Sequence, residues 1–217
     1  MATYFNIPLT SGKDSMKNDF KKGDVKISVP PTILYSMVAK IDDVRKTLTS
    51  DFKESGDVIY QVGKTYNELG GSECYALFDV LGANVPKVRK EDAKRIYGKM
   101  STANDKGLLA SAHDMSDGGL AVALTESAFG GKKGCLIDIP KTEFGALAEL
   151  YSESHSRFVV SVPADKMDEF EALMAKDCTK LGNVIDKNDL SIDIEGKNVI
   201  KTKVSDLHKA WSNGLRQ

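Results

Sequence analysis

The sequence lacks the features that mark several classes of protein. None of its apolar runs approaches the roughly 18 residues that a membrane-spanning helix needs. The first nine residues do not combine a basic start with an apolar core, so no secretory signal is predicted. No Asn-x-Ser/Thr glycosylation site occurs. We therefore expect a cytoplasmic protein that does not bind membranes.

Charge of one sign and cysteine are also scarce. The 217 residues carry 30 Lys+Arg against 31 Asp+Glu, a formal net charge of -1, and neither half is strongly basic. No nucleic-acid partner is expected, because nucleic-acid surfaces depend on clustered Lys and Arg. The cysteines, Cys74, Cys135 and Cys178, are widely spaced and form no CxxC pair. They are predicted to be free thiols in a reducing compartment rather than disulfides or zinc ligands.

The rest of the composition, 41% hydrophobic and 28% charged, is typical of a globular protein. Strand-like and helix-like segments alternate, which predicts an α/β or α+β sheet with helices packed on it. The predicted strands cover residues 25–29, 33–41, 57–62, 108–112, 136–139, 158–162, 183–185 and 190–194, the last two as a pair. The predicted helices cover residues 90–106, 119–129, 142–151 and 165–175, and an amphipathic segment runs over 204–211, in which His208 is expected to be structural. A shift in composition near residues 48–56 predicts a domain boundary.

The densest polar cluster is HDMSDGG at residues 113–119, between a predicted strand and a predicted helix. A helix N-terminus presents free N–H groups, and two glycines leave the backbone open to the close approach of a phosphate. Asp114 offers a hard oxygen ligand to a Mg²⁺ that accompanies such phosphates. The alternative is an ordinary helix start, with Ser116 or Asp117 as the N-cap.

A second polar cluster, SGKDS at residues 11–15, follows an apolar stretch at 4–9 that is interpreted as a strand. Here Lys13 would neutralise phosphate charge, and Asp14 would ligate a metal or orient a nucleophile. The alternative is a solvated turn, because Ser, Gly and Asp are also the residues that turns prefer.

A third cluster, SESHSR at residues 152–157, leads into a strongly β-branched strand. Glu153, His155 and Arg157 together suit the binding of a substrate's polar groups or acid–base work. The alternative is that Glu153 and Arg157 pair at the surface and that His155 is a turn residue.

Three segments in this order are far more specific than any one alone: IPLTSGKDSMKND, SAHDMSDGGLAVALTESAFGG and YSESHSRFVVSV. Together they resemble the C-terminal part of the phosphoribosylformylglycinamidine synthase family, in the superfamily of aminoimidazole ribonucleotide synthetase. PPTILYSMVAKIDDVRK, GDVIYQVGKT and ELGGSEC extend the resemblance over almost the whole chain. It implies an α/β (α+β) C-terminal domain of the synthetase type, a mixed sheet with packed helices, over residues 51–217. Residues 1–50 would be the C-terminal end of an N-terminal, barrel-forming domain.

The resemblance implies part of an ATP- and Mg²⁺-dependent ligase of purine biosynthesis. In that family the amide oxygen of formylglycinamide ribonucleotide is activated by phosphorylation and then displaced by ammonia from glutamine, which gives formylglycinamidine ribonucleotide. The implied cofactors are Mg²⁺ and either ATP as a substrate or ADP as a structural nucleotide. The implied partners are upstream synthetase domains, a glutaminase component and the small-molecule ribonucleotide.

The resemblance also implies roles for individual residues. Gly12 matches a nucleotide-contacting glycine, Ser15 a substrate-contacting serine, Asp114 a metal-binding aspartate and Ser116 a nucleotide-contacting serine. Many small synthetases carry a metal-binding Asn where Lys13 stands, which makes Asp14 the alternative ligand. The candidates are therefore Gly12, Ser116, Gly118 and Gly119 for the nucleotide, Ser15, Glu153 and His155 for the substrate, and Asp114 and Asp14 for the metal.

The family's catalytic histidine and most of its ATP and metal ligands belong to domains upstream of residue 1. No catalytic residue is therefore predicted, and the isolated chain is expected to be inactive, as a fragment or a split-gene product. The alternative is a non-catalytic structural or interaction module with at most a structural nucleotide site, whose exposed strands over 25–41 pair with another domain. A small-molecule kinase of the same superfamily is disfavoured by SGKDSM and ESHSRFVV.

Overall fold

The computed structural model divides into two compact units, Met1–Arg45 and Lys46–Gln217. The residues it describes are 1–9, 12, 19–29, 35–139 and 143–214. Within these ranges, no helix has both the length and the apolar character needed to cross a membrane. The predicted assignment of residues 1–50 and 51–217 to two domain types stays a prediction.

The first unit contains a short helix and a hairpin. The strand predicted at residues 4–9 is wrong: helix α1 (Ala2–Phe5) takes its first two residues, and residues 6–9 form neither helix nor strand. A single helical turn satisfies its backbone groups locally, whereas a strand needs a partner. Strand β2 (Val25–Ile27) confirms the core of the strand predicted at 25–29, and it pairs antiparallel with β1 (Phe20–Lys22). The expected half-burial is wrong, since every residue of both strands is exposed.

The buried strand predicted over residues 33–41 is wrong for its described part. Residues 35–41 have no regular structure, and Tyr35, Met37 and Val38 are exposed. An apolar run becomes a strand only when another strand supplies its hydrogen bonds, and the described part of this unit provides no such partner. Of the loop at 11–15, Gly12 is described and exposed; Ser11, Lys13, Asp14 and Ser15 lie outside the described residues, so the predictions for them remain open.

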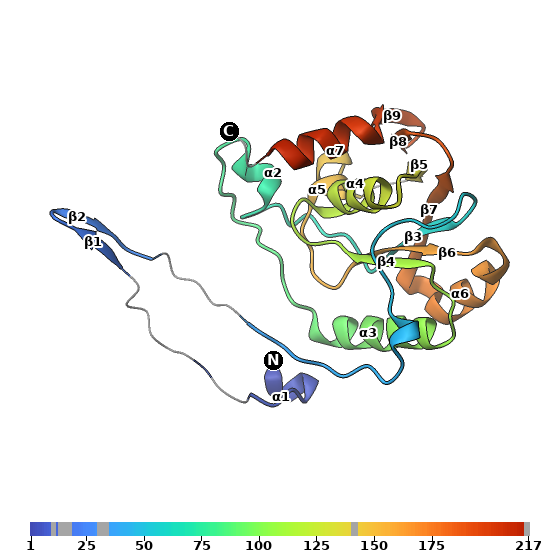
Figure 1. The fold of residues 1–217 in the computed structure, drawn as a ribbon, viewed down its shortest axis with the longest axis horizontal. Helices are drawn as coiled ribbons and strands as arrows, with labels where there is room; N and C mark the ends of the chain where they lie inside the picture. The colour runs from blue at the N-terminus through green and yellow to red at the C-terminus, as the bar shows by residue number, and fades with distance from the viewer. Residues whose placement is uncertain (10–11, 13–18, 30–34, 140–142, 215–217) are drawn as a thin grey trace. The chain divides into compact units, whose positions relative to one another are not determined.

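A seven-stranded mixed sheet forms the centre of the second unit (Figure 1). The strand order is β4-β6-β3-β7-β5-β8-β9. Neighbouring strands are antiparallel except for β5 and β8, which are parallel. The strands are β3 (Val58–Val62), β4 (Ser111–Asp114), β5 (Gly134–Ile139), β6 (Phe158–Val162), β7 (Cys178–Ile185), β8 (Asp189–Ile194) and β9 (Lys197–Lys203). The mixed sheet confirms the predicted fold class.

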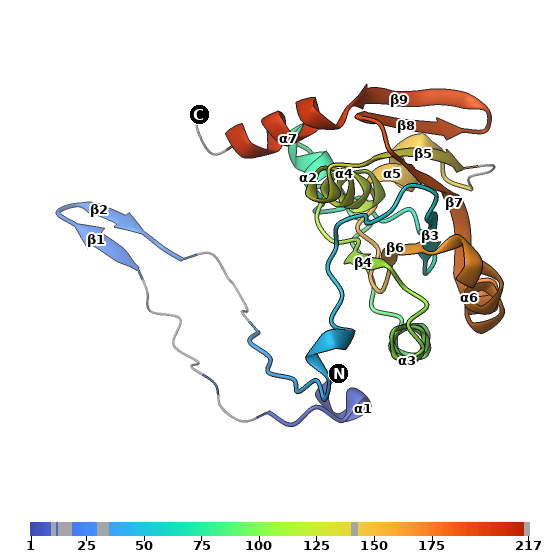
Figure 2. The same ribbon diagram turned by 45° about the vertical axis from the view of Figure 1, so that its right-hand side comes forward.

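Helices cover both faces of this sheet. Helices α4, α5 and α7 lie on one face and α3 and α6 on the other, as Figures 1 and 2 both show. The helices are α2 (Glu73–Ala76), α3 (Lys90–Asp105), α4 (Gly119–Gly131), α5 (Ala146–Tyr151), α6 (Met167–Met174) and α7 (Val204–Asn213). Single 3-10 turns are η1 (Val44–Lys46), η2 (Ala164–Lys166) and η3 (Ala175–Asp177).

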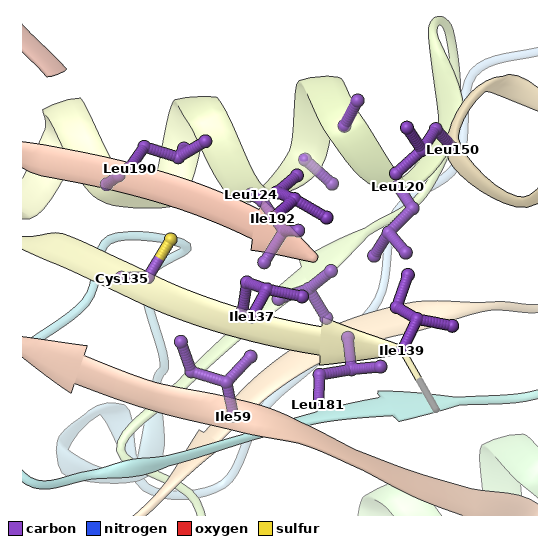
Figure 3. Close-up of a cluster of buried hydrophobic side chains, with 14 of the residues drawn as sticks. Ile59, Leu120, Leu124, Cys135, Ile137, Ile139, Leu150, Leu181, Leu190 and Ile192 are labelled. Carbon is purple, nitrogen blue, oxygen red and sulfur yellow. The ribbon is translucent and has the colours of Figure 1, made fainter. Parts of the chain in front are cut away.

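Each face of the sheet has its own hydrophobic core. Figure 3 shows the first, where Leu120 and Leu124 of α4 point toward Ile137 and Ile192 of the sheet. The second core packs α3 and α6 against the opposite face. Within β3, Ile59 belongs to the first core while its neighbours belong to the second, because successive side chains of a strand point to opposite faces. Burial on both faces explains why β3 and β6 are largely apolar.

Several predicted elements are confirmed close to their expected bounds. The strands at 57–62, 136–139 and 158–162 and the helices at 90–106 and 119–129 are all present, and the amphipathic segment at 204–211 lies in α7. Gly107 ends α3, since its φ is +65° and its N–H donates to the Asn104 carbonyl. The helix predicted at 165–175 forms as η2 followed by α6. The helix predicted at 142–151 begins at Ala146, and Thr142 lies outside the described residues.

Two strand predictions need correction. The strand predicted at 108–112 is β4, which begins three residues later, because Leu108 and Leu109 enter the second core without strand pairing. The predicted pairing of 183–185 with 190–194 is wrong, because β5 lies between β7 and β8. Strand β8 instead forms a hairpin with β9, an exposed, lysine-bearing strand at the sheet edge that the apolar pattern did not reveal.

Candidate functional site

The HDMSDGG segment joins the edge strand β4 to the N-terminus of α4. His113 and Asp114 belong to β4, where they pair with Val159 and Phe158 of β6. Met115 continues the pairing, since its N–H donates to the Arg157 carbonyl over 3.0 Å. The sheet thereby places residues 113–115 directly beside the start of β6, and so beside the SESHSR segment that precedes it.

The two glycines of this loop are required by the backbone. Gly118 and Gly119 have φ values of +76° and +63°, in the left-handed region that favours glycine. A Cβ on Gly119 would lie 2.5 Å from the Ser152 carbonyl oxygen, closer than any real contact. Gly119 therefore lets the start of α4 pack tightly against the end of α5, a structural requirement independent of any ligand.

Neither Ser116 nor Asp117 caps α4, so the predicted alternative of an ordinary side-chain cap is wrong. The N-cap is Gly118, which offers no side-chain oxygen. The Ser116 hydroxyl instead donates to Oδ2 of Asp114. This hydrogen bond is the main reason why the pKa of Asp114 lies below its ordinary value. Asp114 is therefore an ionised carboxylate at neutral pH, and its side chain is 64% exposed.

His113 connects this loop to the body of α4. Its Nε2 lies 2.8 Å from Oε2 of Glu126, and its Nδ1 lies 3.3 Å from Oδ1 of Asp114. Sequence reasoning did not identify Glu126. Helical spacing could have indicated it, because Gly119 and Glu126 are seven residues apart and so lie on the same face of α4.

Glu153 lies at the N-termini of two helices. Its Oε1 accepts hydrogen bonds from the N–H of Gly118, over 2.8 Å, and from the N–H of Glu73 at the start of α2, over 2.9 Å. A carboxylate is stabilised at such a position because the free N–H groups and the helix dipole present positive charge. Glu153 thus supplies the acceptor that Gly118 lacks.

Arg157 does not form the surface pair with Glu153 that the sequence left open. The residue is only 1% exposed. Its guanidinium donates to the carbonyls of Ser152 and Ser154 and, over 3.1 Å, to Oγ1 of Thr65. Burial of the charge lowers the pKa of Arg157 to about 10. Arg157 is therefore a buried structural residue whose hydrogen bonds stabilise the turn that contains Glu153.

A pocket of about 510 Å³ lies at one end of the sheet. Of the two substrate candidates in the SESHSR segment, only His155 lines it. His155 and Ser156 line it, whereas Glu153 and residues 113–119 do not. The wall includes Gln61, Lys64, Tyr66, Arg89, Arg95 and Asp177. The structure therefore brings Glu153, but not His155, next to the Asp114 and Ser116 loop.

Paired charges build the wall of this pocket. The Arg89 guanidinium lies 3.3 Å from the centroid of the Tyr66 ring and bonds Oε1 of Glu68 over 2.8 Å. Asp177 accepts two hydrogen bonds from Arg95, of 3.1 and 2.8 Å, and one of 2.7 Å from Lys99. Sequence reasoning missed both pairs, because their members are 21 and about 80 residues apart and no local pattern links them.

The acidic residues of the candidate site do not form a metal cage. Among the described residues, no three His, Cys, Asp or Glu side chains gather in a way that holds a metal ion. Asp114 offers a single exposed carboxylate. That suits Mg²⁺ only where phosphate oxygens and water supply the other ligands, which is the usual way this ion is held beside nucleotides.

Residues 54–195 match the family of AIR synthase related proteins, C-terminal domain. The chain belongs to this family. The matched range of the AIR synthase related C-terminal domain runs from just before β3 to just after β8. It therefore includes the HDMSDGG loop, the SESHSR turn and the pocket.

Relatives of known function extend this homology over nearly the whole chain. Subunit PurL of phosphoribosylformylglycinamidine synthase from Caldanaerobacter subterraneus subsp. tengcongensis is 36% identical over 216 residues, 98% of this chain and 29% of the relative. The same subunit from Carboxydothermus hydrogenoformans is 37% identical over 216 residues, with 97% and 29% coverage. This AIR synthase related chain is homologous to PurL, and it spans less than a third of the length of these curated relatives.

Solved structures confirm the fold of the domain. Thermotoga maritima PurL in complex with FGAR superposes with a TM-score of 0.67 at 19% identity, over 76% of this chain and 30% of that one. The same protein in complex with ATP gives 0.61 at 18% identity, with 76% and 27% coverage. The hydrogenase maturation protein HypE in complex with ATP gives 0.53 at 17% identity, with 74% and 54% coverage. The family fold is thus shared by proteins with different activities.

Proposed function

We propose that this chain is the C-terminal part of a phosphoribosylformylglycinamidine synthase. The whole enzyme would convert formylglycinamide ribonucleotide to formylglycinamidine ribonucleotide, with ATP and with ammonia from glutamine. The observation that carries the proposal is the 36% identity to a PurL subunit over 98% of this chain. The chain would act with upstream synthetase domains and a glutaminase, since it spans 29% of that relative's length and contains no residue to which we assign catalysis.

Within this role, the start of α4 is proposed to bind a nucleotide. Asp114, Ser116, Gly118 and Gly119 lie together on one loop, with the Asp114 and Ser116 side chains tied to each other. Asp114 would hold Mg²⁺ through its one ionised carboxylate. Mg²⁺, when bound there, would neutralise phosphate charge. Ser116 would turn its hydroxyl from Asp114 to a phosphate oxygen, and the glycines would keep side chains away from the phosphates.

The roles proposed for the other candidates are those that the homology to PurL implies. Gly12 would contact nucleotide, and Ser15 and Asp14 substrate and metal. His155 would contact the ribonucleotide from the wall of the pocket of about 510 Å³. Whether the nucleotide at α4 reacts, as ATP, or is structural, as ADP, depends on those upstream domains.

Nucleotide binding is tested by thermal unfolding of the chain with Mg·ADP. At about 100 times the Kd, the ligand would stabilise the protein by about 2.7 kcal/mol and raise Tm by roughly 5–10 °C. Asp114→Ala should abolish this shift. Asp117→Ala is the matched control. It removes an exposed carboxylate from the same loop, three residues from Asp114, and it should keep the shift. Loss of the shift in both variants, or its persistence in Asp114→Ala, would contradict the assignment.

The ligase proposal has a separate test. The isolated chain, given ATP, Mg²⁺, formylglycinamide ribonucleotide and ammonia, should release no ADP. Addition of a polypeptide equivalent to the rest of a PurL subunit should produce ADP release that depends on the ribonucleotide. Turnover by the isolated chain would show that the catalytic groups lie within these 217 residues.

A non-catalytic interaction module is the second candidate function. It is favoured by the exposed apolar side chains of the segment that follows α2, where Leu77, Phe78 and Leu81 are 84%, 68% and 79% exposed. Such a cluster is typical of a surface that another protein covers. A chain that binds its partner domains but shows neither a Mg·ADP shift nor any effect on turnover would support this function.

A further inference from the structure

The N-terminus of α4 already holds an anion that belongs to the protein. Oε1 of Glu153 accepts from the Gly118 N–H over 2.8 Å, at the end of a helix of 13 residues. The first N–H groups of such a helix attract negative charge, whether it comes from a side chain or from a ligand phosphate. The carboxylate of Glu153 therefore occupies the position that the proposed nucleotide phosphate needs.

Glu153 is held in this position from several directions. A second hydrogen bond, from the N–H of Glu73, fixes the same carboxylate oxygen. The backbone N–H of Glu153 donates to the Glu68 carbonyl over 3.3 Å. The buried Arg157 guanidinium binds the carbonyls on either side, those of Ser152 and Ser154. The carboxylate is thus fixed by the fold and is not a freely rotating surface side chain.

The other side chains of the loop are also joined to carboxylates. The Ser116 hydroxyl donates to Asp114, and Nε2 of His113 lies 2.8 Å from Glu126. Glu126 thus binds a side chain of β4, whereas Glu153 accepts from the helix N–H itself. Glu153 is therefore the carboxylate that a phosphate at the N-terminus of α4 has to displace.

We propose that Glu153 is an internal competitor of the nucleotide phosphate and sets the affinity of the α4 site for phosphate-bearing ligands. This inference rests on the proposed nucleotide site. In the free protein Glu153 stabilises the ends of α4 and α2; on binding, the phosphate takes over the Gly118 N–H and the carboxylate moves aside. The same residue thus raises the stability of the free chain and lowers its affinity for the ligand.

Glu153→Gln separates the charge from the shape. Glutamine keeps the chain length and one oxygen that accepts from Gly118, and it removes the negative charge. We expect a lower Tm without ligand, because the attraction between charge and helix dipole is lost. We also expect Mg·ADP and inorganic pyrophosphate to bind roughly fivefold to thirtyfold more tightly, since Glu153 is half-buried and that range corresponds to the strength of a partly buried charge at a helix terminus. Titration calorimetry measures both affinities.

Glu126→Gln is the matched control. It removes a nearby carboxylate of α4, one that bonds His113 and not the Gly118 N–H. Its effect on affinity should stay below about twofold, as expected of a charge that does not compete for the same donor. Equal tightening in both variants would show that only the general negative charge of the loop matters, and it would overturn the inference.

The amide resonance of Gly118 provides a direct readout. It should move when Glu153→Gln is introduced and again when pyrophosphate is added. If Mg·ADP binds the wild-type chain in an Asp114-dependent way but Glu153→Gln binds no more tightly, the nucleotide site stands and the competition is refuted. If neither ligand binds either protein, the nucleotide site and this inference both fail. If Glu153→Gln binds these ligands and the wild-type chain does not, the competition is supported, because the Glu153 carboxylate then prevents binding altogether.

Discussion

Asp177 offers the sharpest test of the electrostatics that build this domain. Its side chain is 6% exposed and accepts hydrogen bonds from Arg95 and Lys99 of α3, so it joins that helix to the turn before β7. The hydrogen bonds from Arg95 are the main cause that lowers the pKa of Asp177 from 3.8 to about 2. We predict that Asp177→Asn destabilises the protein at neutral pH and that the difference vanishes in acid.

The magnitude follows from the pKa. A fall from 3.8 to about 2 corresponds to about 2.4 kcal/mol, because one pKa unit is worth about 1.36 kcal/mol. The Arg95 and Lys99 side chains are 38% and 24% exposed, so water screens part of this energy and we expect about 2 kcal/mol. The pKa is lowered in the folded state. The stabilisation is therefore complete above about pH 4 and is lost as the pH falls toward 2.

The assay is thermal or urea unfolding of the wild type and Asp177→Asn at several pH values. At pH 7 the variant should unfold roughly 4–8 °C lower, as expected for about 2 kcal/mol in a domain of this size. Asp92→Asn is the control: Asp92 also bonds Arg95, but its side chain is 47% exposed, and the loss should be below about 1 kcal/mol. Equal stability of the Asp177→Asn variant and the wild type at pH 7, or a difference that does not change with pH, would refute the reasoning.

Two further predictions concern backbone space and core packing. Gly119→Ala should destabilise the protein by about 2 kcal/mol or more, since φ is +63° and a Cβ would lie 2.5 Å from the Ser152 carbonyl oxygen. Gly98→Ala in α3 is the control, because a Cβ there meets nothing within 4 Å. It should stabilise the protein by up to about 1 kcal/mol. Urea unfolding of the pair decides this, and a stable Gly119→Ala would contradict it. Leu124→Ala should cost about 2–5 kcal/mol because Leu124 is 0% exposed, whereas Leu147→Ala, 47% exposed, should cost less than about 1 kcal/mol. Similar losses in both leucine variants would show that the core in Figure 3 is misassigned.

The elements that could be predicted are those whose signal is local. The β-branched run at 158–162 and the helical spacing at 90–106 appear as β6 and α3, because each pattern depends on residues that are neighbours in the chain. Gly107 ends α3 for the same reason. The family resemblance also rested on contiguous motifs, and the family match over residues 54–195 confirms it.

Pairing between distant segments could not be predicted. Strands β7 and β8 are neighbours in sequence but are separated in the sheet by β5, and nothing in either strand specifies that insertion. Strand β9 was missed because it lies at the exposed sheet edge, where lysines replace the apolar alternation. In the first unit, residues 35–41 are apolar enough for a strand, but among its described residues no third strand pairs with them.

The same division holds for the candidate site. The sequence by itself located the HDMSDGG loop before a helix and the SESHSR turn before a strand, because glycines, carboxylates and helical periodicity are visible in a contiguous stretch. Only the tertiary structure decided that Glu153 caps α4, that Arg157 is buried, and that His155 lines a pocket away from Asp114. The physical reason is that hydrogen bonds and burial depend on which segments the sheet brings together, and that assembly is determined by packing over the whole domain.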